Sequence, residues 1–246
     1  MADIPDAPLL YATFALRVRA LVLDSLILFA VLLAAVAVAA NVHLGQSGRL
    51  TLFGGLVALV ILYEPLLIAS RGRTVGHWLC NLRVVAPTAD GRLPLWKAFL
   101  RWFLKGLTGL ASFATMGATP RNQALHDLAF GTTVQVADPA RAKPQHFILE
   151  RPAVPAGTLP SGARRILVIL GYLIVLLVLS SFGELLAASP ACLNANRCEP
   201  RERLFAQVVN VAWLAASIAV CTFGWQGRLP GARRRPEGAL PAQNEE

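Results

Sequence analysis

The sequence predicts an all-α membrane protein with about four transmembrane helices, an amphipathic interfacial helix and a small cytoplasmic β-element. The chain of 246 residues is 55% hydrophobic and only 15% charged, which is far from the balance of a soluble domain. Four apolar runs each approach the ~20 residues that a helix needs to cross ~30 Å of hydrocarbon. These runs cover residues 20–40, 50–69, 166–187 and 204–224.

The first run is predicted to remain in the membrane as the first span. It extends over about 21 residues and contains Asp24, whereas the apolar core of a secretory signal peptide has about 7 to 15 residues. We therefore expect an uncleaved anchor and a multi-pass protein of the bacterial inner (plasma) membrane.

The placement of the basic residues predicts the orientation. Of the 23 lysines and arginines, seven lie in residues 70–105 and six in residues 121–165, whereas residues 41–49 contain only Arg49. The positive-inside rule then places both termini and both basic regions in the cytoplasm. We interpret the net charge of +9 as orientation and contact with anionic lipid headgroups, and not as nucleic-acid binding.

Residues 95–118 are hydrophobic but are not predicted to cross the membrane. Leu95 and Phe99 begin an apolar series that recurs every four residues, and Lys97, Arg101 and Lys105 form a basic series at the same step. This pattern is typical of an amphipathic helix at the membrane surface. A fifth crossing would also place a strongly basic loop outside. A re-entrant path for residues 106–119 is the alternative.

The remaining segments divide the chain into five parts. "NLRVVAPTADGRLP" and "GTTVQVAD" predict two short strands that meet in a cytoplasmic sheet. Residues 11–138 then form one membrane domain behind a cytoplasmic tail of residues 1–10. A Pro- and Gly-rich cytoplasmic linker covers residues 139–164, a two-helix transmembrane hairpin covers residues 165–224, and a disordered cytoplasmic tail covers residues 225–246.

Two of the four cysteines lie close together in the connection between the last two spans. Cys192 and Cys198 fall outside the cytoplasm in the four-span topology, where an oxidising compartment favours a disulfide. The alternative is two free thiols that are near each other only in sequence. They are too few to hold a metal ion, and Cys80 and Cys221 are expected to be reduced thiols on the cytoplasmic side.

Three motifs in the first half occur in a characteristic order: "RVRALVLD", "GRTVGHWLCNLRVV" and "ALHDLAFGTTVQV". With this spacing, residues 11–138 resemble the RDD family of bacterial membrane proteins. The resemblance assigns the signature arginine to Arg17 and the two aspartates to Asp24 and Asp127. It also implies a lysine after Gly76, where this chain has His77. Members are generally of unknown function, and some have been linked to cation and proton exchange.

Arg17 and Asp24 are predicted to share a helix face without pairing. Seven residues separate them by about 10 Å along the axis, and helical side chains lean toward the N-terminus, so Arg17 points away from Asp24. We expect Arg101 to neutralise Asp24, with Arg121 as the second choice. For Asp127 we expect a helix-capping or arginine-pairing role.

Glu64 is predicted to lie at a depth similar to that of Asp24, on the second span. Asp24, Glu64 and Arg101 therefore form the candidate ion or proton site, because an intramembrane carboxylate is costly unless it is used or paired. The other interpretation is a structural or assembly protein in which these charges only fix helix packing. Four spans leave little room for a conduit, so transport would favour a homo-oligomer.

Catalysis is not expected from this sequence. His126 and Asp127 form an "HD" pair, but the other histidines lie in unrelated places and provide no metal-ligand set. The sequence also lacks a Ser, His and Asp arrangement and a Gly-rich phosphate loop. We therefore expect neither a cofactor nor a catalytic metal.

Overall fold

The computed structural model describes residues 9–42, 45–87, 91–152, 159–195 and 198–233. It divides into two compact units, the first made of residues 1–107 and 119–152 and the second of residues 108–118 and 153–246. The expected tails 1–10 and 225–246 lie partly outside the described residues, as does the expected linker 139–164.

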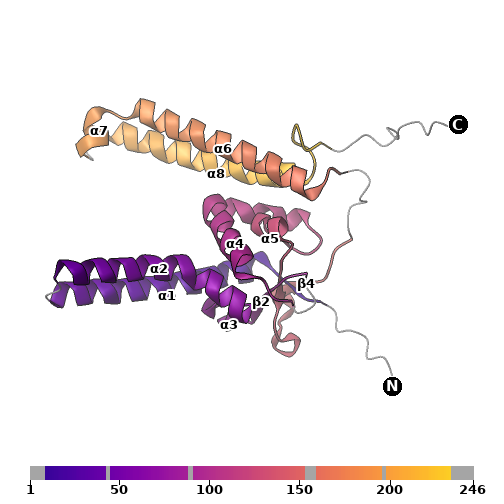
Figure 1. Cartoon of the computed structure of the whole chain (residues 1–246). Helices are drawn as coiled ribbons and strands as arrows, with labels where there is room; N and C mark the ends of the chain where they lie inside the picture. Colours follow the sequence, from indigo (N-terminus) through magenta and orange to yellow (C-terminus); the bar gives the residue numbers. More distant parts are fainter. Residues whose placement is uncertain (1–8, 43–44, 88–90, 153–158, 196–197, 234–246) are drawn as a thin grey trace, which may run out of the picture. The chain divides into compact units, whose positions relative to one another are not determined.

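Four long helices confirm the predicted class of an all-α membrane protein. Each is long and apolar enough to cross a membrane, and at most 17% of its most apolar stretch is buried inside the protein. Apolar side chains are thus directed outward, as lipid contact requires. Figure 1 shows these helices in two pairs: α1 (Phe14–Asn41), α2 (Gln46–Arg71), α6 (Gly162–Ala187) and α8 (Pro200–Trp225).

In the first unit, the chain leaves α2 through a tight turn. Gly72 caps α2 in the left-handed conformation at φ 68°, which glycine adopts without strain. The short helix α3 (Val75–Leu79) follows directly, with Thr74 as its N-cap. Asn81, at φ 57°, then turns the chain into strand β2 (Leu82–Val85). This turn places α3 beside α1.

A four-stranded antiparallel sheet lies at the end of the first helix pair. Its order is β2-β3-β1-β4, and β2 pairs with β3 so that Val84 lies opposite Val134. The two predicted strands are therefore adjacent. Strand β3 covers Thr133–Val136. Strands β1 (Tyr11–Ala12) and β4 (Phe147–Ile148) have two residues each and were not predicted, and β4 lies in the segment expected to be a linker.

The sheet packs on the ends of α1 and α2. Leu82 and Val84 of β2 are buried in one cluster with Leu16 and Ala20 of α1 and Ile68 of α2. Burying such side chains contributes about 1.5 to 3 kcal/mol each. This cluster fixes the start of α1 and the end of α2 on the sheet, at the level where the signature residues lie.

The segment expected as one interfacial helix is two elements. Helix α4 (Leu95–Thr108) is amphipathic, with Ala98 and Arg101 buried and Trp96 and Phe103 more than half exposed. After it the backbone changes to a 3₁₀ helix, η1 (Gly109–Ala118), which belongs to the second unit. The short helix α5 (Leu125–Phe130) then returns to the first unit.

In the second unit, α6 and α8 form a long hairpin, and η1 packs against α8. Gly224 allows a close approach, because a Cβ there would lie 3.1 Å from Ile169 Cδ1. Near the same end, the guanidinium of Arg165 lies 3.9 Å from the ring centre of Trp225 and donates to its carbonyl at 2.8 Å.

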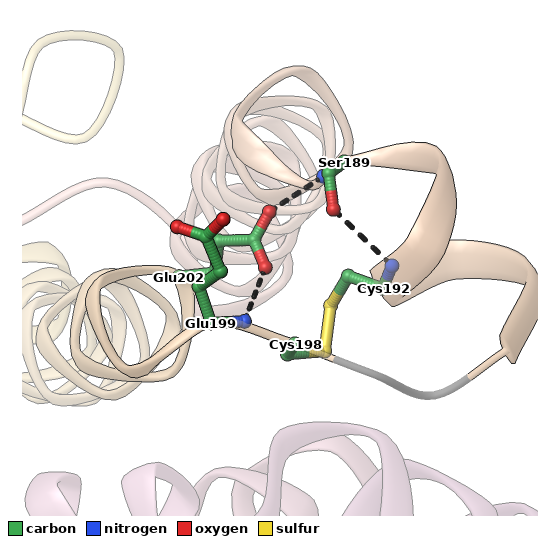
Figure 2. The surroundings of a disulfide bond; sticks show 5 residues. All are labelled: Ser189, Cys192, Cys198, Glu199 and Glu202. Atoms are coloured by element: carbon green, nitrogen blue, oxygen red, sulfur yellow. Dashed lines mark hydrogen bonds between the residues drawn. A yellow bond between two sulfur atoms is a disulfide. The ribbon is translucent and has the colours of Figure 1, made fainter.

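The opposite end of the hairpin is closed by α7 (Pro190–Ala195) and a disulfide between Cys192 and Cys198. Figure 2 shows that Glu202 joins the two sides of this connection. Its carboxylate accepts from Ser189 N at 2.8 Å and from Glu199 N at 2.7 Å. The two sulfurs and the Glu202 carboxylate lie close together, but the sulfurs are bonded to each other, so these residues do not form a metal site.

Replacing Cys192 and Cys198 together by serine is expected to lower the free energy of unfolding of the hairpin by about 2 kcal/mol, because the short loop loses its constraint in the unfolded chain. Thermal unfolding of the purified protein in detergent measures the change. Reductant should lower the melting temperature of the wild type and leave the double variant unchanged. Equal sensitivity of both proteins to reductant would contradict the disulfide.

Candidate functional site

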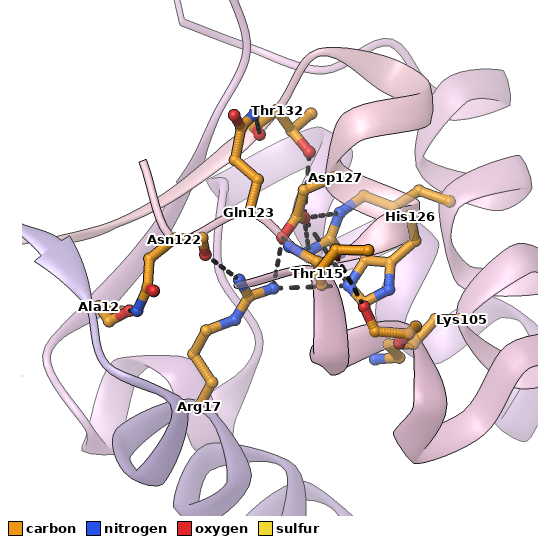
Figure 3. A network of polar contacts seen from close by, with 12 residues as sticks. Ala12, Arg17, Lys105, Thr115, Asn122, Gln123, His126, Asp127 and Thr132 are labelled. Carbon is orange, nitrogen blue, oxygen red and sulfur yellow. Dashed lines mark hydrogen bonds and ion pairs between the residues drawn. The ribbon is translucent and has the colours of Figure 1, made fainter. Parts of the chain in front are cut away.

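Arg17 and Asp127 form the central ion pair of the first unit. Arg17 lies in the first turns of α1, and Asp127 lies on α5, 110 residues later. The Nη2 atom of Arg17 donates to Asp127 Oδ2 at 2.5 Å, and the two side chains are 4% and 0% exposed. Arg17 Nη1 also donates to the Asn122 carbonyl at 3.2 Å. Figure 3 shows this guanidinium between the two acceptors.

Arg101 of α4 binds the same carboxylate from another side. Its Nε and Nη2 atoms donate to Asp127 Oδ1 at 3.0 and 2.8 Å. Asp127 accepts further hydrogen bonds from Thr132 Oγ1 at 3.2 Å and from the Ala124 backbone N–H at 3.1 Å. The last bond caps the start of α5, so Asp127 both caps a helix and pairs with arginine.

These contacts determine the ionisation of Asp127. Burial opposes the charged carboxylate, but Arg17 and Arg101 outweigh burial and hold the pKa of Asp127 well below its usual range. The carboxylate is therefore ionised at any physiological pH.

Glu64 extends the cluster to α2. Arg101 Nη1 donates to Glu64 Oε1 at 3.2 Å, and Lys105 Nζ, one turn further along α4, contacts the other carboxylate oxygen. We call the set Arg17, Glu64, Arg101, Lys105 and Asp127 the ion cluster. It joins α1, α2, α4 and α5 through three cations and two carboxylates.

His126 lies next to the ion cluster and is completely buried. Its Nε2 atom is 3.5 Å from Arg17 Nη2 and 3.7 Å from Asp127 Oδ1. Burial lowers the pKa of His126 well below its ordinary value, although Asp127 acts in the opposite direction. The ring is thus neutral at pH 7, and Nε2 is able to accept from Arg17.

Asp24 lies in a separate polar site on α1. Its Oδ1 atom accepts from the Tyr63 hydroxyl at 2.7 Å and from the Gly76 backbone N–H at 2.7 Å. Its Oδ2 atom accepts from Thr74 Oγ1 at 2.6 Å. Within the described part of the chain, no arginine or lysine lies at ion-pair distance from Asp24.

The expected pairing of Arg101 with Asp24 is therefore wrong. The three nitrogens of Arg101 all donate to Asp127 and Glu64, so its guanidinium lies in the ion cluster and not against Asp24. The second choice is wrong too, because Arg121 Nε pairs with Glu150 at 2.8 Å. The turn into α3 brings neutral donors to Asp24 instead.

Gly76 makes this approach of α3 to α1 possible. A Cβ at position 76 would lie 2.7 Å from Asp24 Cγ and would also press against the Ala20 carbonyl. Only a glycine fits at this separation. The same close approach aims the Gly76 N–H at the Asp24 carboxylate.

Thr74 links Asp24 to His77. Thr74 Oγ1 lies 2.5 Å from His77 Nδ1, and His77 Nδ1 is 3.9 Å from Asp24 Oδ2. The single hydroxyl hydrogen of Thr74 is donated to the Asp24 carboxylate, so hydrogen accounting requires Nδ1–H of His77 to donate to Thr74. We call Asp24, Tyr63, Thr74, Gly76 and His77 the aspartate site.

The pKa of His77 is lowered to about 4, mainly by burial. Among the charged groups around it, Glu64 and Asp24 favour the protonated ring, whereas Lys105 and Arg101 oppose it. His77 is therefore neutral at pH 7. It lies within electrostatic range of both the aspartate site and the ion cluster.

The structure thus divides the residues predicted as one site. Glu64 and Arg101 meet in the ion cluster together with Arg17 and Asp127, while Asp24 belongs to the aspartate site. The sequence interpretation missed Tyr63 and Thr74 as partners of Asp24 and Lys105 as a partner of Glu64. A signal existed for Thr74, because a threonine before a short helical segment is a typical N-cap.

Comparison with known protein families gives a match in the first half of the chain. A family model described as the RDD family matches residues 11–131, a range that contains both the ion cluster and the aspartate site. No curated protein matches the chain, and no solved structure does.

Asp127→Asn is expected to lower the free energy of unfolding by about 3 to 5 kcal/mol, because it leaves two buried arginines around a neutral side chain. Thermal or denaturant unfolding in detergent measures the loss. Asp138→Asn is the matched control, since Asp138 only caps a short turn through Ala140 N and asparagine caps equally well. Equal stability of the two variants would contradict a central role for the ion cluster.

Gly76→Ala is expected to lower the free energy of unfolding by about 1 to 3 kcal/mol, because the added methyl group overpacks the contact between α3 and α1. The control is Gly106→Ala on α4, where an added Cβ meets nothing within 4 Å. That variant should keep or slightly raise the stability. A Gly76→Ala protein that unfolds at the wild-type temperature would show that α3 is not held against α1.

Proposed function

Because the chain is an RDD domain-containing integral membrane protein, we propose that Asp24 binds a proton and that the protein couples this binding to the movement of a small cation or solute. One observation carries the proposal: among the described residues, the three hydrogen-bond donors to the carboxylate of Asp24 are neutral groups. A carboxylate held in a membrane span without a cation is able to change its protonation state without releasing a buried counter-charge.

Glu64 and Arg101 have a different role in this proposal. Glu64 already contacts two cations, and Arg101 contacts two carboxylates. Protonating Glu64 or deprotonating Arg101 would leave the opposite buried charge without compensation. The ion cluster therefore holds α1, α2, α4 and α5 together, and Asp24 is the proposed proton-binding group.

Thr74 and His77 provide a path for the proton. In the hydrogen-bonded chain from His77 Nδ1 through Thr74 Oγ1 to Asp24 Oδ2, a proton taken up at His77 Nε2 allows the Nδ1 proton to pass to Thr74 and the Thr74 hydroxyl proton to pass to Asp24, so that His77 and Thr74 both end neutral. A protonated Asp24 accepts fewer hydrogen bonds than the carboxylate. Proton binding therefore weakens the contact that holds α3 on α1, which provides a conformational response to the proton.

The alternative function is that of a structural or assembly protein. It is favoured by the complete pairing of the charges in the ion cluster, which is what a packing device requires. In either case we propose a non-catalytic protein of the bacterial inner membrane, with both termini in the cytoplasm and basic loops on anionic lipid. Transport by four spans would need a homo-oligomer to enclose a path.

Asp24→Asn is expected to abolish proton movement driven by a cation gradient while leaving the protein folded, because asparagine retains two hydrogen-bonding sites but does not titrate. The measurement uses proteoliposomes that contain a pH-sensitive dye, with sodium, potassium and lithium gradients tested separately. Protein amounts are matched by size-exclusion profile. Glu184→Gln is the control, since Glu184 is a carboxylate of α6 that accepts from Asn210 outside the RDD domain.

Two substitutions at Thr74 separate transport from packing. Thr74→Val keeps the shape but removes the relay hydroxyl and with it the N-cap of α3, so it should slow the flux per folded molecule, whereas Thr74→Ser should retain both the cap and the flux. Loss of folded protein in Asp24→Asn, with no change of flux per folded molecule, would overturn the transport proposal and favour the structural function.

A further inference from the structure

A cavity of about 360 Å³ lies where α2 passes into α3. It opens beside the aspartate site but is made largely by other side chains. The residues that line it are Leu67, Arg71, Arg73, Thr74, Val75 and Trp78. Two of the six are arginines and none is acidic.

Arg71 and Arg73 differ from the arginines of the ion cluster. Arg17 and Arg101 donate to carboxylates, but neither Arg71 nor Arg73 forms an ion pair or a side-chain hydrogen bond with any residue that the structure describes. Arginine presents a planar set of N–H donors that matches the oxygens of a phosphate group. The cavity therefore offers two guanidiniums with unused donors to an anionic ligand.

The cavity lies at the end of a span, where hydrocarbon gives way to headgroups. Arg71 is the last residue of α2, and the ring of Trp78 on α3 is 58% exposed. Tryptophan is enriched at this level of a membrane because its ring is apolar and its N–H is polar. Leu67 and Val75 add apolar surface on the side of the spans. This mixture fits a ligand with a phosphate at one end and hydrocarbon at the other.

We propose that this cavity binds the phosphate group of an anionic glycerophospholipid. Arg71 and Arg73 hold the phosphate, and Leu67, Val75 and Trp78 contact the glycerol and the first acyl carbons. The Thr74 hydroxyl is already donated to Asp24, so recognition of the phosphate rests on the arginines. Two cations in a lining that contains no acidic residue select an anionic lipid over a zwitterionic one. This inference does not depend on proton binding at Asp24.

Native mass spectrometry of the full-length protein in detergent tests the proposal by titration with phosphatidylglycerol and, separately, phosphatidylcholine. We expect preferential binding of phosphatidylglycerol to the wild type. Arg71→Ala/Arg73→Ala should weaken that binding by about 25-fold, since each basic residue near an anionic lipid contributes about fivefold. Arg71→Lys/Arg73→Lys should give an intermediate loss, because it keeps the charge but not the planar donor set.

Arg83→Ala/Arg141→Ala is the control for net charge, because both arginines are exposed in the same unit, outside the cavity. It should bind phosphatidylglycerol like the wild type. Equal weakening by the two alanine pairs would overturn the proposal in favour of unspecific charge attraction. A separate titration with inorganic phosphate distinguishes a free anion from a lipid. Arginine-dependent binding of phosphate without a preference for phosphatidylglycerol would overturn the assignment to lipid.

Discussion

The double hydrogen bond from Arg101 to Asp127 Oδ1, with Arg17 bound to Oδ2, is the interaction on which the first unit depends. A buried carboxylate is costly, and a pair of buried ions stabilises a fold only when the remaining donors and acceptors are also satisfied. Asp127 meets this condition because Thr132 and the Ala124 N–H bind it as well. Its position on α5 therefore specifies where α1 and α4 must lie.

The two signature aspartates are stabilised by different means. Asp127 is surrounded by cations, whereas Asp24 accepts from two hydroxyl groups and a backbone N–H. A charged partner fixes the ionised state, because protonation would leave the partner alone in a buried place. Neutral donors stabilise the carboxylate without that penalty. The same residue type is thus paired with cations at position 127 and bound only by neutral described donors at position 24.

The sequence was sufficient for the spans and the amphipathic helix, because run length and the four-residue period of residues 95–107 follow directly from membrane thickness and helix geometry. The partner of Asp24 was not predictable in this way. The depth of Asp24 along α1 indicated which residues of the other spans lie at the same level. Its partners Thr74 and Gly76 are instead brought to it by the five-residue helix α3 and its N-cap. Strands β1 and β4 are also too short to show a pattern.

Thr74 connects the aspartate site to the arginine-lined cavity, since its hydroxyl donates to Asp24 and its side chain lines the cavity. A ligand that shifts Thr74 changes the number of donors at Asp24 and with it the free energy of protonation. Linkage then requires that protonation change the affinity for that ligand by the same factor. The proposed lipid contact and the proposed proton binding would therefore be linked through Thr74.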